Sequence, residues 1–139
     1  MEIQEKTQVQ ILQDLIAVLN NRKELIEKLS KKFPALQDGN KSLSQYKTQT
    51  KKFIAALLAE LSAYGDATGE ADPDNDYNNY WKTALKKWDT ISQHRAVTIL
   101  SALEQLLANM YKTILDAPSE LPASFKTLLV DQLAELTDK

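Results

Sequence analysis

The 139-residue chain contains no cysteine, a single histidine and only three glycines. Without cysteine there can be no disulfide, no zinc–thiolate site and no thiol nucleophile. One histidine excludes, within one chain, any metal centre that needs several imidazoles. Neither a Gly-x-Ser-x-Gly elbow nor a glycine-rich phosphate loop is present. The sequence therefore lacks the motifs that usually carry a catalytic serine or bind the phosphates of a nucleotide. We therefore expect no catalytic residue, no cofactor and no enzymatic activity.

An excess of positive charge is also missing. The 17 lysines and arginines face 19 acidic residues, which gives a formal charge of -2 and disfavours nucleic acid as a partner. The longest uninterrupted apolar run, Ile54 to Ala59, is far shorter than the ~20 residues of a membrane span. The first ten residues, MEIQEKTQVQ, lack the basic start and apolar centre of a signal peptide. We expect a cytoplasmic protein without a membrane partner, folded as one domain over residues 1–139.

What the chain does contain is helical periodicity. Apolar residues recur at three- and four-residue steps from Thr7 to about Lys32, and Pro34 predicts that this first helix ends near Phe33. Ser42 and Gln45 have the spacing of a capping box, so a second helix is predicted to begin there. Gly65 is placed to follow its end.

The second half of the chain continues this pattern after a long acidic loop, Gly65 to Asp76. A third apolar stripe runs from Trp81 to Ile114, with polar residues and the possible cap Ser92 between residues 89 and 93. A fourth helix is predicted to start near Leu121-Pro122. The sequence thus predicts an all-α protein, an antiparallel four-helix bundle whose third helix is interrupted near residues 89–93.

The segment Leu12 to Leu29, LQDLIAVLNNRKELIEKL, resembles the first helix of an uncharacterised bacterial ferritin-like family with a domain of unknown function. The resemblance extends over nearly the whole chain and continues at Leu43, Gln45, Phe53, Leu57, Glu60, Gly65, Trp81, Ile99, Leu100, Glu104, Leu121, Pro122, Leu128, Leu129 and Gln132. It implies a ferritin-like bundle and a link to bacterial stress responses. Ferritin-like di-iron proteins take a glutamate from each of two helices and a Glu-x-x-His pair from each of the other two.

The ligands of such a di-iron site are mostly missing here. No Glu-x-x-His occurs, and Gln49 and Thr50 stand where the resemblance implies acids. Glu24, Glu60 and Glu104 remain as candidate metal ligands, although any solvated helix face offers such residues. Two hypotheses follow: a metal-free structural or partner-binding bundle, or an iron- or manganese-binding redox protein that uses the residual carboxylates.

A calcium loop is a further possibility to weigh. Oxygen-bearing side chains alternate as in the first half of an EF-hand loop, at Asp72, Asp74, Asp76 and Asn78. Tyr77 occupies the position that needs glycine, and Thr83 occupies that of the closing glutamate. An acidic, solvated loop in which Asp76 caps the third helix is the interpretation we favour.

The remaining candidates concern the surface. Lysines at helical spacing form two possible basic ridges, Lys47, Lys51 and Lys52, and Lys82, Lys86 and Lys87, which also fit ordinary solvated faces. The aromatic cluster of Trp81, Tyr77 and Tyr80 could anchor a protein partner or belong to the core, whereas Trp88 fits the core. His94 fits an exposed helix start. Apolar residues on more than one face of the third helix favour a homodimer.

Overall fold

The computed structural model describes residues 8–38, 41–64, 76–117 and 121–137. Five helices make up almost all of these ranges: α1 (Gln8–Lys32), α2 (Leu43–Ser62), α3 (Asp76–Lys87), α4 (Gln93–Asp116) and α5 (Ala123–Thr137). A 3-10 turn, η1 (Trp88–Thr90), follows α3, and two short strands, β1 (Gln37–Asp38) and β2 (Lys41–Ser42), pair between α1 and α2. The all-α prediction is confirmed.

The first hairpin forms much as the sequence predicts. The apolar stripe of α1 is buried, and the helix ends at Lys32, two residues before Pro34. The two strands are antiparallel and lead directly into α2, a feature that the sequence did not indicate. The capping box is confirmed, because Ser42 Oγ accepts from the Gln45 amide while the Ser42 amide donates to Gln45 Oε1. Gly65 lies outside the described residues, and Ala63 closes the helix with ordinary right-handed angles.

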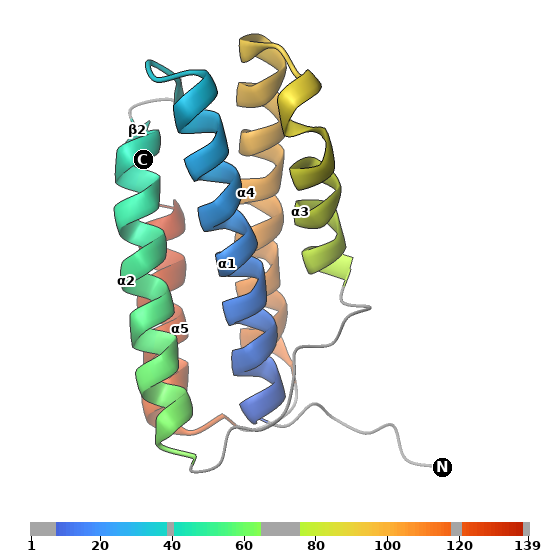
Figure 1. Cartoon of the computed structure of the whole chain (residues 1–139). Coiled ribbons are helices and arrows are strands. Elements are labelled where there is room, and N and C mark those ends of the chain that lie inside the picture. The colour runs from blue at the N-terminus through green and yellow to red at the C-terminus, as the bar shows by residue number, and fades with distance from the viewer. Residues whose placement is uncertain (1–7, 39–40, 65–75, 118–120, 138–139) are drawn as a thin grey trace.

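The predicted interruption near residues 89–93 is confirmed, but it divides the predicted third helix into two, so that five helices are described and not four. At residues 88–92 the chain reverses, so that α3 and α4 are separate, antiparallel helices (Figure 1). Ile91 and Ser92 are extended, and Ser92 Oγ caps α4 by accepting from the Arg95 amide, as predicted for Ser92. The predicted loop lies outside the described residues as far as residue 75, and Asp76 is the first residue of α3.

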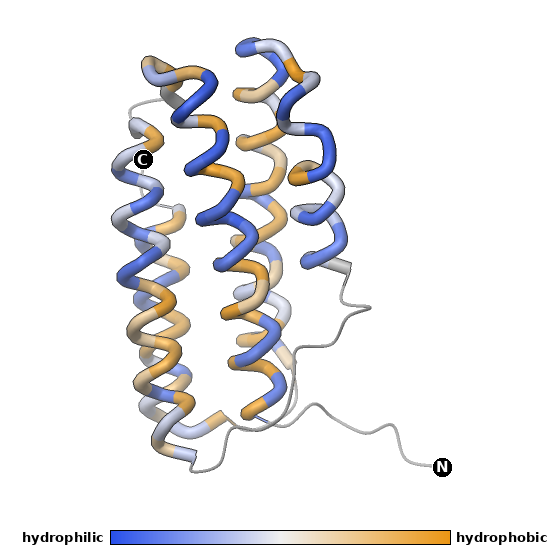
Figure 2. Tube along the Cα trace, viewed as in Figure 1, coloured by the Kyte–Doolittle hydropathy of each residue, from blue (hydrophilic) through white to orange (hydrophobic). Residues whose placement is uncertain are grey.

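The helices form a closed ring in the order α2, α1, α3, α4, α5. In Figure 1 the four longer helices stand side by side, and the short α3 lies against α1 and α4. Figure 2 shows the alternating hydropathy along the helices, whose apolar faces turn inward. The buried core contains leucines of α1, α2, α4 and α5 together with the largest buried aromatic side chains, Trp81, Tyr111, Phe53 and Phe125.

Polar contacts join α1 to α3 and to the η1 turn that follows it. The Asn21 amide group donates to the buried Asn78, and the Lys28 ammonium lies 5.1 Å from the centroid of the Trp88 ring. At the far end Lys32 Nζ donates to the backbone carbonyls of Asp89 and Ile91 at 2.6 and 3.0 Å. An ammonium group at the end of a helix satisfies carbonyls that have no partner within the helix.

The start of α5 agrees with the prediction, because the carbonyl of Pro122 accepts the first helical hydrogen bond, from the Lys126 amide at 2.9 Å. Across the described ranges, no helix has the length and apolar character that crossing a bilayer requires.

Candidate functional site

A buried arginine occupies the inner face of α1. Arg22 lies in the same stripe as Leu15, Leu25 and Leu29, and its side chain is completely inaccessible to solvent. An arginine keeps its charge under all ordinary conditions, and burying that charge is costly unless it is paired. The local fold therefore requires that other helices supply acceptors at this level.

The counterion comes from α4. Arg22 Nε donates to Glu104 Oε2 at 2.8 Å, and Arg22 Nη2 donates to Glu104 Oε1 at 2.6 Å. This is a two-pronged, charge-assisted contact in which both carboxylate oxygens accept from the guanidinium. The Glu104 side chain is only 15% exposed, so the pair lies at the inner edge of the bundle.

α2 supplies the other acceptors. Arg22 Nη1 donates to Thr50 Oγ1 at 3.0 Å, and Nη2 donates to Gln49 Oε1 at 2.9 Å. The Thr50 hydroxyl in turn donates to the Tyr46 carbonyl, and the guanidinium carbon lies 5.2 Å from the centroid of the Tyr46 ring. One cation thus joins three helices through directed hydrogen bonds and contacts an aromatic ring.

A second polar contact extends toward α5. The Tyr111 hydroxyl donates to Gln132 Oε1 at 2.6 Å, and Gln132 Nε2 donates to the Phe53 carbonyl at 3.3 Å. Burial raises the pKa of Tyr111 well above its ordinary value, while the charge of Arg22 acts in the opposite direction. Tyr111 is therefore a neutral hydrogen-bond donor at physiological pH. Together with the Arg22 contacts we call these groups the central polar network, formed by Arg22, Tyr46, Gln49, Thr50, Glu104, Tyr111 and Gln132.

The three candidate metal ligands do not converge. Glu24 is exposed and lies two positions from the buried Arg22, which places it on the opposite side of α1. Glu60 is eleven residues beyond Gln49, about 16 Å farther along α2 at 1.5 Å per residue, and accepts from Ser124 Oγ at 3.2 Å. No group of three or more His, Cys, Asp or Glu within the described ranges is arranged to hold a metal ion.

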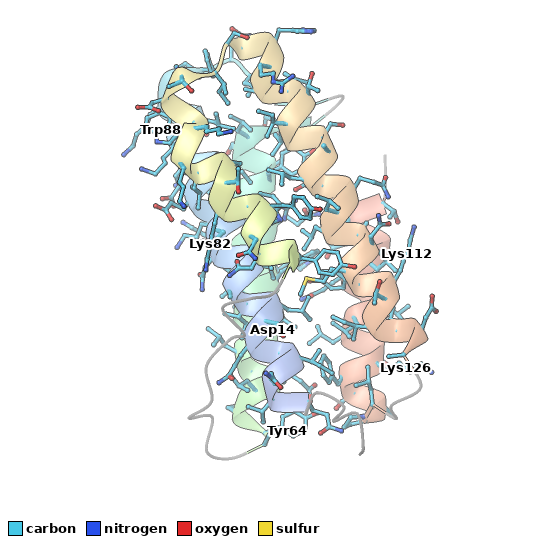
Figure 3. The ribbon with its side chains drawn as sticks, turned by 90° about the vertical axis from the view of Figure 1, so that its right-hand side faces the viewer. Asp14, Tyr64, Lys82, Trp88, Lys112 and Lys126 are labelled. Carbon is cyan, nitrogen blue, oxygen red and sulfur yellow. The ribbon has the colours of Figure 1, made fainter. Side chains whose placement is uncertain are left out.

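Glu60 instead affects the pKa of a neighbouring tyrosine. Partial burial, and after it the neighbouring Glu60 carboxylate, raise the pKa of Tyr64 near the end of α2. Figure 3 labels Tyr64 at the lower end of the molecule. The carboxylate of Glu104, in contrast, is engaged by Arg22.

The predicted partner-binding residues separate into different environments. Trp81 is fully buried, which makes it a core residue and corrects its assignment as a possible surface anchor. Its Nε1 finds no hydrogen-bond acceptor among the residues that the structure describes. Tyr77 is half-buried, with its hydroxyl 3.3 Å from Thr113 Oγ1, whereas Tyr80 is 56% exposed. Trp88 packs partly buried against the core, as predicted.

Asn78 is unavailable as a calcium ligand because it is buried and bonded to Asn21. Asp72 and Asp74, two of the other residues in that pattern, lie outside the described residues, as does the side chain of Asp76 and with it the predicted cap. His94 is exposed in the first turn of α4, as predicted.

The two lysine ridges differ in how their charges are paired. On α2, Lys47 lies 3.6 Å from a Glu27 carboxylate oxygen and Lys52 lies 3.0 Å from Glu135. The α3 lysines are exposed, and none of them forms an ion pair with any residue in the described part of the chain: Lys82, Lys86 and Lys87. Both arrangements are those of solvated helix faces.

Sequence reasoning did not identify the central polar network, although signals for it exist. Arg22 follows Leu15 and Val18 and precedes Leu25 and Leu29 at helical spacing, so it interrupts an apolar stripe. Thr50 interrupts the stripe of α2 in the same way. A polar residue inside the buried stripe of each of two helices indicates that those residues pair across the core.

Comparisons with protein-family models, with curated proteins and with solved structures found no match to this chain.

Proposed function

We propose that this protein is a non-catalytic, ferritin-like helical bundle that acts as a structural or partner-binding protein. The observation that carries the proposal is the pairing of Arg22 with Glu104. A bundle of this kind builds a metal or cofactor site from polar side chains that face its centre. Here a guanidinium already supplies the central positive charge, and its hydrogen bonds occupy both oxygens of the only candidate carboxylate that faces inward.

The rest of the central polar network supports the same conclusion. Arg22 does not lose its proton, and the raised pKa of Tyr111 keeps that hydroxyl neutral. Neither group can exchange a proton with a substrate near neutral pH. The partners of Gln49, Thr50 and Gln132 all lie within the chain. The central polar network therefore fits a role in holding the helices together. We accordingly assign the function of the protein to its surface. A connection with bacterial stress responses rests on the family resemblance alone.

Metal loading tests the proposal. The protein is incubated with Fe(II) in air and, separately, with Mn(II), freed of loose metal by gel filtration, and analysed for bound metal by mass spectrometry. We expect far less than one ion per chain, the same as for a Glu24→Ala variant. A stoichiometric, tightly held ion would refute the proposal, and its loss in Glu24→Ala or Glu60→Ala would establish the redox hypothesis in its place.

A further inference from the structure

The core that surrounds the central polar network consists mainly of leucine. Among the residues that the structure describes, leucine supplies more than half of the buried hydrophobic core, and it occurs on α1, α2, α4 and α5. Leucine side chains resemble one another in shape and carry no polar atoms, so any of them packs acceptably against any other. Cores dominated by leucine therefore specify the positions of their helices poorly. Apolar packing alone leaves several relative positions of these helices close in free energy.

A displacement of α4 by one turn against α1 would exchange Glu104 for an apolar residue. One turn is about 5.4 Å along the helix axis. The residues one turn before and after Glu104 are Leu100 and Ala108, and both are buried. Neither side chain can accept a hydrogen bond from Arg22. The guanidinium would remain charged and buried without its counterion, so this displacement is strongly disfavoured.

The contacts of α2 and α5 are equally specific for position. Of the residues one turn from Thr50, Ile54 has no side-chain acceptor, and Tyr46 already contacts the guanidinium through its ring. The Tyr111 hydroxyl reaches Gln132 on α5, which in turn reaches a backbone carbonyl of α2. All these directed hydrogen bonds form together at one relative position of the four helices.

We propose that the central polar network selects one relative position of α1, α2, α4 and α5 from those that the leucine-rich core permits, and that it adds little net stability. Well-packed apolar side chains of the same volume often stabilise a core as much as a buried ion pair does. The main effect of the network therefore lies in the arrangements that it excludes. This inference goes beyond the proposed function, because it concerns the positions of the helices and not what the surface binds.

The distance between two spin labels measures the position of α4 against α1. The chain has no cysteine of its own, so Lys31→Cys and Lys112→Cys introduce two exposed labelling sites. Lys31 lies nine residues after Arg22, and Lys112 lies eight residues after Glu104 on a helix that runs the opposite way (Figure 1). The labels are consequently separated by about 25 Å along the bundle, and a displacement of one turn changes their distance by about 3–5 Å.

Double electron–electron resonance on the full, labelled chain should give one narrow distance distribution. With Arg22→Leu/Glu104→Leu added, we expect a second maximum displaced by about 3–5 Å, or a broadening of that size, in a protein that circular dichroism still shows to be helical. The matched control is Glu27→Gln/Lys47→Gln, which removes an ion pair between α1 and α2 at the surface. It should leave the narrow distribution unchanged.

Every other outcome overturns the proposal. An unfolded Arg22→Leu/Glu104→Leu protein would show that the network supplies net stability. A narrow distribution at the original distance in this variant would show that the apolar core fixes the helices without the network. Several distances in the labelled parent chain, or equal broadening in the control, would also contradict it. None of these measurements depends on bound metal or on a surface partner, so the proposed function is tested separately.

Discussion

Removing the counterion of Arg22 should strongly destabilise the protein. In Glu104→Leu the guanidinium stays fully buried but loses two charge-assisted hydrogen bonds, each worth about 1.5–3 kcal/mol. Breaking a buried ion pair by removing one partner costs about 3–5 kcal/mol. Because the Glu104 side chain is 15% exposed and water can reach its edge, we expect the lower part of this range, about 3 kcal/mol.

Urea denaturation followed by circular dichroism at pH 7 measures this loss. With a slope of about 1.5 kcal/mol per molar urea, the unfolding midpoint of Glu104→Leu should fall by about 2 M. The loss should persist in 1 M salt, because ions screen buried charges poorly. The control is Glu24→Leu, which alters an exposed carboxylate on the other side of α1 and should change stability by less than about 0.5 kcal/mol.

The double variant Arg22→Leu/Glu104→Leu separates the cost of an unpaired charge from the contribution of the pair. Replacing both partners with apolar residues should restore most of the stability, because no buried charge remains. A coupling free energy of at least about 2 kcal/mol is expected. The reasoning would be refuted if Glu104→Leu cost less than about 1 kcal/mol, as for an exposed pair, or if the two substitutions were additive.

Three further substitutions test single contacts. Ser42→Ala removes the cap of α2 and should lower the free energy of unfolding by about 1 kcal/mol in urea, whereas the exposed Ser44→Ala should not. Lys32→Met keeps the aliphatic stem but leaves the carbonyls of Trp88, Asp89 and Ile91 without the ammonium, so hydrogen exchange should accelerate in this turn and stay unchanged in α2. Burial raises the pKa of Tyr111 in the folded state. The protonated hydroxyl therefore contributes its full stabilisation below the unfolded pKa of about 10, and this contribution is lost as the pH rises above that value. Wild-type stability should therefore fall above pH 10 by about 1.4 kcal/mol per pH unit from this group, and Tyr111→Phe should remove that part of the slope.

Features that depend on nearby residues could be predicted from the sequence. The bounds of α1, the capping box at Ser42 and the cap at Ser92 each involve groups within a few positions of one another. The reversal before α4 could not be predicted in the same way. It contains no glycine, because Ile91 and Ser92 turn the chain with extended angles that any residue adopts. The sequence therefore marked an interruption but not a change of direction.

The central polar network was partly visible in the sequence. Arg22 and Thr50 interrupt apolar stripes, which indicates buried polar groups. Their partners could not be inferred, because Glu104 is 82 residues from Arg22 and its contact depends on the rotation of α4 about its axis. The same uncertainty in rotation left Trp81 open between a partner anchor and a core residue, and the structure shows that it is buried.

The contact between Lys32 and the carbonyls of Trp88, Asp89 and Ile91 makes the second hairpin dependent on the first. A peptide of residues 76–116 would contain both helices of the reversal but not the ammonium that holds their turn. Residues 8–64 include the cap that begins α2, so the first hairpin carries its own local signal. Chains are made from the N-terminus, and α1 is therefore complete before α3 leaves the ribosome. The order of synthesis thus places the Lys32 ammonium in the chain before the carbonyls that it contacts.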